Sequence, residues 1–133
     1  MVPDLDIKNL HLKKLCVGVN SFEMLKEWQD NEINNNRQIY HVTRVKPKRA
    51  GEIIPNGSLY WIVKNKFVAR QRIIEFKDVI RVDGKSACQI IFDSKLFKVV
   101  NIPHRPFQGW RYLKQEMVPK DIFKDQNNNE IPA

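Results

Sequence analysis

The side chains with the clearest chemical potential are cations that stand near aromatic rings. In the segment Arg44-Val-Lys46-Pro-Lys48-Arg49, four cations fall within six residues. Lysine and arginine placed in this way neutralise phosphate groups without reading a base sequence. The same run also fits a solvated loop after an edge strand, where charges keep sheets from aggregating. Both interpretations are open from the sequence alone.

A second segment, residues 104–112, reads His-Arg-Pro-Phe-Gln-Gly-Trp-Arg-Tyr and mixes cations with aromatic rings. His104, Arg105 and Arg111 could grip an anionic ligand, and Trp110 could stack on a planar one. The alternative is a terminal segment whose rings close one end of a barrel. We expect both in part, with the rings packed and the cations exposed.

A predicted strand over residues 58–64 carries two adjacent aromatic residues, Tyr60 and Trp61. Neighbouring side chains point to opposite faces of a strand. One ring is therefore expected in the core, and the other exposed or covered by a loop, where it could stack on a base. Alternatively, both rings are buried because the sheet is covered on both faces.

Arg70 and Arg72 are two residues apart on a predicted strand, so they share one face. Their forked donors suit phosphate or carboxylate groups. The competing interpretation is a pair of cross-strand salt bridges with acids of the neighbouring hairpin. The candidate nucleic-acid-binding residues are Arg44, Lys46, Lys48, Arg49, Trp61, Lys64, Arg70, Arg72, His104, Arg105, Trp110 and Arg111.

Signatures of catalysis are missing from the sequence. It contains no GxSxG, Walker A, GxGxxG or HExxH motif. The residues that most often bind zinc, namely His11, His41, His104, Cys16 and Cys88, are isolated and show no ligand spacing. The sequence therefore indicates no catalytic residue, no cofactor and no metal site.

The elements that must position these residues follow from local patterns. Phe22, Leu25 and Trp28 recur at three-residue spacing and predict a helix that is capped by Asn20 and ends near Asn34. Strands are predicted over 11–18, 38–46, 58–64, 67–82, 85–93 and 98–102, with a short second helix over 48–54. This order predicts an α+β fold with a mostly antiparallel, curled sheet or small pseudo-barrel.

Composition sets the size and charge of the protein. The 133 residues fit one domain, 42% of them are hydrophobic, and the net charge is +8. Residues 37–72 contain nine Lys and Arg but one acid, whereas both ends are slightly acidic. Such concentrated positive potential attracts polyanions. We expect a loose lead-in over residues 1–10, a single domain over 11–123 and a polar, mobile tail over 124–133.

The expected location is the cytoplasm, without a membrane partner. The longest apolar run, Leu59 to Val63, is far shorter than the roughly 20 residues that span a bilayer. The first residues lack the charged leader and apolar stretch of a secretory signal. Cys16 and Cys88 are far apart and fit two reduced, buried thiols.

Five blocks of the chain resemble an uncharacterised family typical of alphaproteobacteria, the domain-of-unknown-function family number fourteen eighty-nine. The resemblance covers residues 11–122. Members of this family carry no assigned activity, so the resemblance implies none for this chain. The blocks are 14–19 (Lys-Leu-Cys-Val-Gly-Val), 41–50, 57–64, 69–73 and 107–113.

The predicted order of elements, with its Leu-Tyr-Trp strand, is also similar to that of the PUA-like superfamily. This superfamily contains small pseudo-barrels such as PUA, ASCH and EVE domains, many of which bind RNA or modified bases. The Gly-x-Lys-x-x-Glu-x-Arg pattern of ASCH domains is absent. The similarity implies a ligand cleft between the loop after the second strand and the later strands, lined by Arg44, Lys46, Lys48, Arg49, Trp61 and Arg70.

Three functional hypotheses follow. The first is a non-catalytic module that binds nucleic acid, either RNA or a modified base, with an affinity that falls steeply with salt. The second is a protein-interaction domain whose basic face meets an acidic partner. The third is a small enzyme for a nucleotide-like substrate, which requires His41, His104 or a carboxylate in one pocket with the arginines. The sequence does not indicate an oligomeric state.

Overall fold

The central strand, β3 (Ser58–Val63), organises the fold because every one of its residues is buried. The computed structural model describes residues 9–132, so most of the expected lead-in over residues 1–10 lies outside the described residues. The aromatic and β-branched side chains of β3 favour an extended backbone and present apolar groups to both faces. A covering layer is therefore required on each side.

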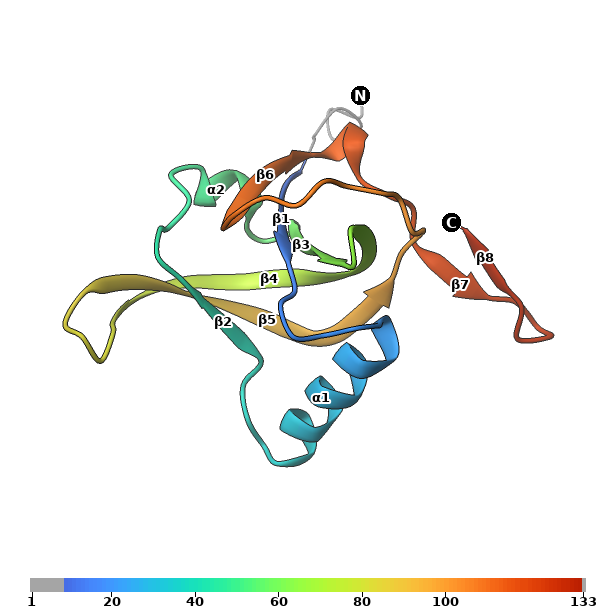
Figure 1. Cartoon of the computed structure of the whole chain (residues 1–133), viewed down its shortest axis with the longest axis horizontal. Coiled ribbons are helices and arrows are strands. Elements are labelled where there is room, and N and C mark those ends of the chain that lie inside the picture. The colour runs from blue at the N-terminus through green and yellow to red at the C-terminus, as the bar shows by residue number, and fades with distance from the viewer. Residues whose placement is uncertain (1–8, 133) are drawn as a thin grey trace, which may run out of the picture.

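Five further strands join β3 in a curled sheet (Figure 1): β1 (Leu10–Leu15), β2 (Tyr40–Thr43), β4 (Lys66–Ile80), β5 (Ser86–Lys98) and β6 (Trp110–Lys114). The order is β2-β5-β4-β3-β1-β6, which makes β2 and β6 the outer strands. β1 runs parallel to β3, and the other neighbours are antiparallel. The expected α+β class with a mostly antiparallel, curled sheet is confirmed. Within the described residues the sheet does not close into a barrel.

Two helices accompany the sheet, α1 (Phe22–Asn34) and α2 (Ala50–Ile53), as expected. The cap of α1 is Ser21 rather than Asn20, because the Ser21 hydroxyl oxygen accepts the Met24 N–H at 3.1 Å. Leu25 and Gln29, four residues apart, are the buried positions of the helix. Trp28 therefore lies on the side of this buried face and is half exposed.

The two faces of β3 lie in two separate apolar clusters. Trp61 belongs to the larger cluster, together with Leu25 of α1 and Phe92 of β5. Tyr60 belongs to the smaller one, together with Val99 and Leu113. Both rings are buried, so the interpretation with a sheet covered on both faces is confirmed.

The second half of the chain differs from the prediction in three elements. β5 continues to Lys98, so the separate strand expected over 98–102 is wrong. β6 was not expected, since Gly109 and the prolines before it are typical of loops. Part of the expected tail forms a hairpin of β7 (Ile122–Lys124) and β8 (Glu130–Pro132), whose turn is held by the Asp125 carboxylate.

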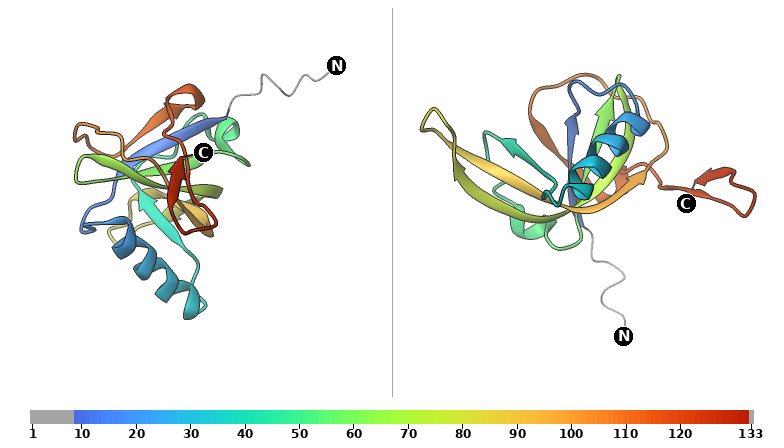
Figure 2. Two further views of the ribbon diagram at one scale, coloured as in Figure 1. Left: turned by 90° about the vertical axis from the view of Figure 1, so that its right-hand side faces the viewer. Right: turned by 90° about the horizontal axis from the view of Figure 1, so that it is seen from below.

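Two hairpins extend from opposite ends of the sheet, the long β4–β5 pair and the short β7–β8 pair (Figures 1 and 2). β1 and β6 pair with each other at one side of the sheet, and α1 packs beside the end of β5. Among the helices of the described chain, none is long and apolar enough to cross a membrane.

Candidate functional site

The two basic segments singled out in the sequence meet in space. We call residues 44–49 the basic loop. Its Val45 carbonyl accepts the Trp110 indole N–H at 2.8 Å, and the Arg49 N–H donates to the Tyr112 hydroxyl at 3.1 Å. The Arg49 guanidinium also lies 5.4 Å from the centre of the Tyr112 ring. These contacts bring the loop after β2 onto the inner face of β6, although more than 60 residues separate them in sequence.

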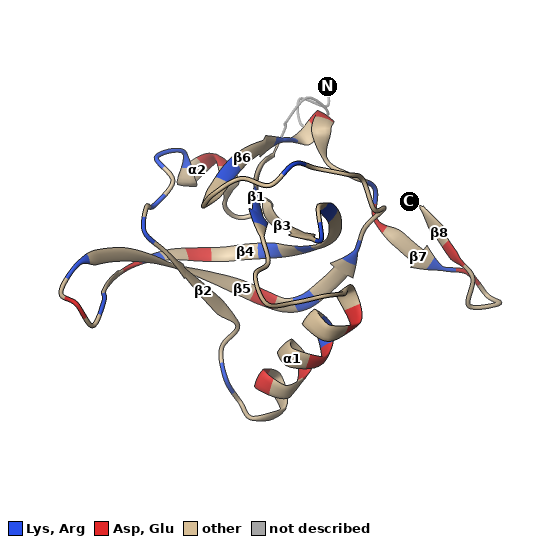
Figure 3. Ribbon diagram, in the orientation of Figure 1, with Lys and Arg blue, Asp and Glu red and all other residues tan. Residues whose placement is uncertain are grey.

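The basic loop places several Lys and Arg residues between β2 and α2 (Figure 3), and these cations are only weakly neutralised. Arg44 and Lys48 are exposed, and neither has an ion pair with another described residue. Lys46 lies 4.0 Å from the Asp78 carboxylate, and Arg49 lies 2.7 Å from that of Glu52. Both of these pairs are solvent-exposed, where such contacts contribute little. The loop therefore keeps most of its positive potential.

A second cluster of cations lies on the other face of β6. We call Lys13, His104, Phe107 and Arg111 the Phe107 cluster. Lys13 of β1 and Arg111 of β6 are direct cross-strand neighbours. Their charged groups lie 5.8 Å and 5.3 Å from the centre of the Phe107 ring. Like charges directly opposite each other destabilise a strand pair. In the described part of the chain no carboxylate forms an ion pair with either cation.

His104 holds the lysine of this cluster in place. Its Nδ1 lies 2.7 Å from the Arg105 carbonyl oxygen, which only accepts, so Nδ1 carries the proton. Nε2 is then the acceptor for the Lys13 ammonium group at 2.8 Å. Burial, together with the nearby Arg111 charge, lowers the pKa of Lys13. The arrangement fixes a poorly compensated, partly buried cation beside Arg111.

Arg70, by contrast, is used within the fold. Its Nε and Nη2 donate to the two carboxylate oxygens of Asp121 at 2.6 Å and 2.7 Å, and its Nη1 donates to the Ser58 hydroxyl at 3.1 Å. The Phe97 ring covers the guanidinium at 4.2 Å. The hydrogen bonds to Asp121 raise the pKa of Arg70. Arg70 is therefore a salt-bridge residue, as the competing interpretation predicted.

Arg72 is engaged in a similar way. It donates to the Asp93 carboxylate at 2.9 Å and to the Pro55 carbonyl at 3.1 Å. The backbone N–H of Lys95 and the Arg72 guanidinium lower the pKa of Asp93. The salt-bridge interpretation thus describes both arginines, with Asp121 and Asp93 in place of the hairpin acids.

Two further candidates have different surroundings. Lys64 is exposed in the turn between β3 and β4, next to Asn65, whose carbonyl accepts the His104 N–H at 2.8 Å. Lys64 thus borders the Phe107 cluster. Trp61 is 4% exposed, and its indole N–H points to the Gln71 amide oxygen at 3.4 Å. Trp61 is therefore a core ring and not an exposed stacking surface.

Sequence reasoning missed a buried polar network around His11. The His11 Nδ1 accepts the Ser58 N–H at 2.9 Å, so Nε2 is protonated and donates to the Gln115 side-chain oxygen at 2.7 Å. His11 shares an open pocket of about 400 Å³ with Tyr60, Arg70 and Asp121. Among the pockets described, this one comes nearest to the enzyme hypothesis, because it combines a histidine, a carboxylate and a candidate arginine. Since both His11 nitrogens and the Arg70 donors are already hydrogen-bonded, the network is suited to holding strands together.

Burial lowers the pKa of His11, which makes stability depend on pH. The unfolded chain takes up this proton first as the pH falls, so stability is full above about pH 6.5 and declines below it. The expected loss of unfolding free energy approaches about 1.4 kcal/mol per pH unit for each such histidine. Urea denaturation at several pH values measures it. A His11→Asn variant, which keeps an acceptor for Ser58 N–H, should show a smaller decline, and an unchanged decline would contradict the assignment.

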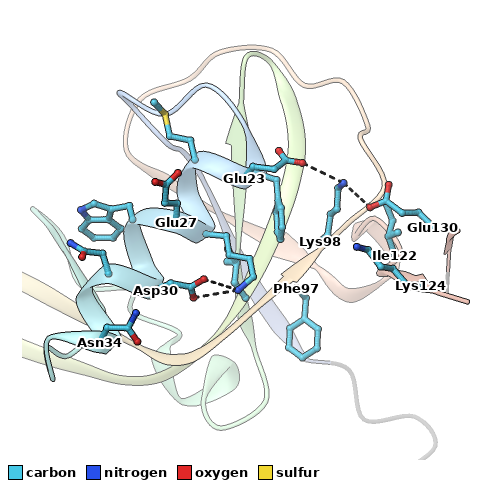
Figure 4. A pocket seen from close by; sticks show the side chains of 15 residues that line it. Glu23, Glu27, Asp30, Asn34, Phe97, Lys98, Ile122, Lys124 and Glu130 are labelled. Atoms are coloured by element: carbon cyan, nitrogen blue, oxygen red, sulfur yellow. Dashed lines mark hydrogen bonds and ion pairs between the residues drawn. The ribbon is translucent and has the colours of Figure 1, made fainter. Parts of the chain in front are cut away.

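A wide groove beside α1 does not suit an anion. It has a volume of about 1090 Å³ and lies between α1, the end of β5 and the β7–β8 hairpin (Figure 4). Asp30 pairs with Lys26 at 3.0 Å. Lys98 lies 2.7 Å from the Glu130 carboxylate and 3.8 Å from that of Glu23. Four carboxylates against three lysines leave the groove with a net charge of −1, which disfavours an anion.

A smaller pocket of about 370 Å³ lies between α1, β1 and β2. Lys14, Cys16, His41 and Trp61 are among its lining residues. Of the six residues expected to line a ligand cleft, Trp61 contributes to this pocket, while the four cations of the basic loop are exposed and Arg70 belongs to the opposite face. In residues 9–132 no group of three or more His, Cys, Asp or Glu side chains is placed to hold a metal ion.

Comparison with known proteins identifies the family of the chain. Neither a curated protein nor a solved structure matches it. A family model described as "Protein of unknown function (DUF1489)" matches residues 12–133. This match includes the basic loop and the Phe107 cluster and agrees with the family resemblance of the sequence blocks. The chain therefore belongs to the DUF1489 family of proteins of unknown function.

Proposed function

We propose that this protein is a non-catalytic module that binds single-stranded nucleic acid along the edge formed by β6 and the basic loop. The observation that carries the proposal is the Lys13–Arg111 pair. Two cations stand directly opposite each other without an ion pair to a described carboxylate. A phosphate placed between them would relieve their repulsion and accept hydrogen bonds from both.

The aromatic neighbours of these cations support a nucleic acid over a simple anion. Phe107 and Trp110 lie on β6 or just before it and are partly exposed. Rings next to phosphate-binding cations offer stacking surfaces that tolerate any base. Arg44 and Lys48 extend the positive surface beyond the inner face of β6. A strand could then follow the β6 edge, with successive phosphates meeting the Phe107 cluster and the basic loop.

The test is fluorescence anisotropy with labelled single- and double-stranded RNA and DNA across a salt series. We expect single-stranded ligands to bind, with an affinity that falls steeply as salt rises. Lys13→Met and Arg111→Met should each weaken binding to all sequences and reduce the salt slope by about one. Lys85→Met is the matched control, since Lys85 is exposed at the tip of the β4–β5 hairpin.

Equal slopes in the wild type and in both cluster variants would overturn the assignment of the interface. An acidic protein surface would meet the same exposed cations of the basic loop, and it is the alternative ligand. That alternative predicts no binding to bare oligonucleotides at physiological salt. A cytoplasmic location, in which Cys16 and Cys88 stay reduced, belongs to the same proposal.

A further inference from the structure

The pocket between α1, β1 and β2 has the walls of a site for a planar ligand. Its floor includes the buried rings of Trp61 and Phe92, and Leu25 of α1 closes one side. Trp28 and Tyr40 stand at its rim, each 49% exposed. Its volume of about 370 Å³ lies at the lower end of the range for small-ligand sites, roughly 300–1,000 Å³. The space therefore suits one small, flat molecule.

The polar groups of the lining divide into two sets. Gln29 is satisfied within the protein, because its amide exchanges hydrogen bonds of 2.9 Å and 2.7 Å with that of Gln71. Lys14, Cys16 and His41 are left to meet a ligand, together with the Tyr40 hydroxyl and the Trp28 indole N–H at the rim. None of the lining residues is an acid. A cationic ligand would thus find no counter-charge, whereas an anionic one would find Lys14.

The protonation states of Lys14, Cys16 and His41 also determine which ligands the pocket can hold. Burial and the neighbouring Lys14 charge lower the pKa of His41, so its imidazole is neutral at pH 7. Burial raises the pKa of Cys16 to about 11, so its thiol stays protonated. Burial also lowers the pKa of Lys14. The pocket thus offers one cation, one imidazole that can donate and accept, and one neutral thiol.

The position of Lys14 connects the pocket with the proposed interface. Lys13 and Lys14 are consecutive in β1, so they point to opposite faces of the sheet. Lys14 pairs in register with Trp110 of β6 and with Trp61 of β3. Lys14 therefore shares a face with Trp110, the ring that bonds to the basic loop. A strand that crosses the β6 edge would reach Lys14 next.

We propose that this pocket holds one unpaired base of the bound strand, with the base among the apolar lining residues and its phosphate on Lys14. The inference rests on the proposed function, because the base enters as part of a strand held by the basic loop. The apolar lining residues would cover the faces of the base, and His41 would hydrogen-bond to its edge. Base stacking contributes to affinity without requiring a particular sequence.

The first test uses nucleoside monophosphates and ¹⁵N NMR of the labelled protein. The three indole N–H signals report separate places, since Trp61 is in the pocket floor, Trp28 at the rim and Trp110 outside the lining. We expect the signals of Trp61 and Trp28 to shift on titration. Lys14→Met should weaken this binding about tenfold, as loss of a charge-assisted hydrogen bond does. Lys85→Met should leave it unchanged.

A second variant keeps the inference testable if Lys14→Met disturbs the fold. Val19, a partly exposed lining residue, can be replaced by phenylalanine to fill the pocket without changing charge. Val19→Phe should abolish the shifts caused by monophosphates and should weaken oligonucleotide binding while leaving its salt slope intact. Dispersed amide spectra of each variant confirm that it is folded.

The experiments distinguish a failure of the pocket inference from a failure of the proposed function. Oligonucleotide binding that depends on Lys13 and Arg111 but is unaffected by Val19→Phe would overturn the pocket inference and leave the proposed function standing. Indole shifts with monophosphates, but no binding of any oligonucleotide, would overturn both statements and indicate a site for a free small molecule. Weaker binding of Val19→Phe with an unchanged salt slope supports both.

Discussion

Gly57→Ala is expected to lower the free energy of unfolding by about 3 kcal/mol or more, because the site lacks room for a methyl group. A Cβ at this position would lie 2.5 Å from the Ile53 carbonyl oxygen and would also collide with that of Leu10. Backbone oxygens cannot rotate away as a flexible side chain does. Gly57 joins α2 to β3 and contacts the start of β1. The substitution would therefore disturb the pairing that positions Lys13 and Lys14.

Urea denaturation at neutral pH measures this loss, and Gly51→Ala provides the matched control. Gly51 lies in α2, and no heavy atom lies within 4 Å of the place that an alanine Cβ would take there. Alanine at this position should be neutral or stabilise the protein by up to about 1 kcal/mol, since it favours helix. Equal losses at the two positions would contradict the steric argument.

Asp121→Ala is expected to lower the free energy of unfolding by about 2 to 3 kcal/mol, because it leaves the Arg70 guanidinium without its carboxylate partner. The pair is largely shielded, with side-chain exposures of 23% for Arg70 and 17% for Asp121. Two of the Arg70 donors would lose their acceptor in a place that water reaches poorly. Both residues lie beside Tyr60, so the loss also loosens the smaller apolar cluster.

A double-mutant cycle isolates this contact. Arg70→Met and Asp121→Leu should each destabilise the protein, and the combined variant should cost less than the sum by about 1 to 3 kcal/mol. Additive losses would contradict a direct partnership. The same variants test whether Arg70 also binds phosphate. Because its donors are engaged by Asp121 and Ser58, the salt slope of oligonucleotide binding should be unchanged in folded Arg70→Met. A slope reduced by about one would return Arg70 to the interface.

The sequence could not predict what surrounds Arg70, Arg72 and Trp61 in the folded protein. An arginine on a strand face looks the same in sequence whether it meets a phosphate or an aspartate. The Asp121 partner of Arg70 lies 51 residues further along the chain and reaches it because the segment after β6 returns to the sheet. The burial of Trp61 likewise depends on α1 and β2 folding over that face.

Local sequence patterns predicted the helices and strands whose formation depends on residues close together in the chain. The run Ser58–Val63 is rich in aromatic and β-branched residues, and Asp83-Gly84 is a good hairpin turn, so β3 and the β4–β5 hairpin were evident. The spacing of apolar residues likewise predicted α1. β6 could not be predicted from local pattern, because its few residues follow prolines and a glycine. Its stability comes from pairing with β1, which lies about 100 residues earlier in the chain.

The sequence by itself determined the α+β class, the family, the concentration of positive charge and the identity of the cations that remain exposed in the basic loop. These depend on composition and on neighbours a few residues apart. Tertiary structure alone decided that Lys13 stands opposite Arg111, that Trp110 bonds to the basic loop and that Lys14 shares a pocket with His41. Those contacts join residues from distant parts of the chain, and the order of strands in the curled sheet, which no local pattern encodes, brings them together.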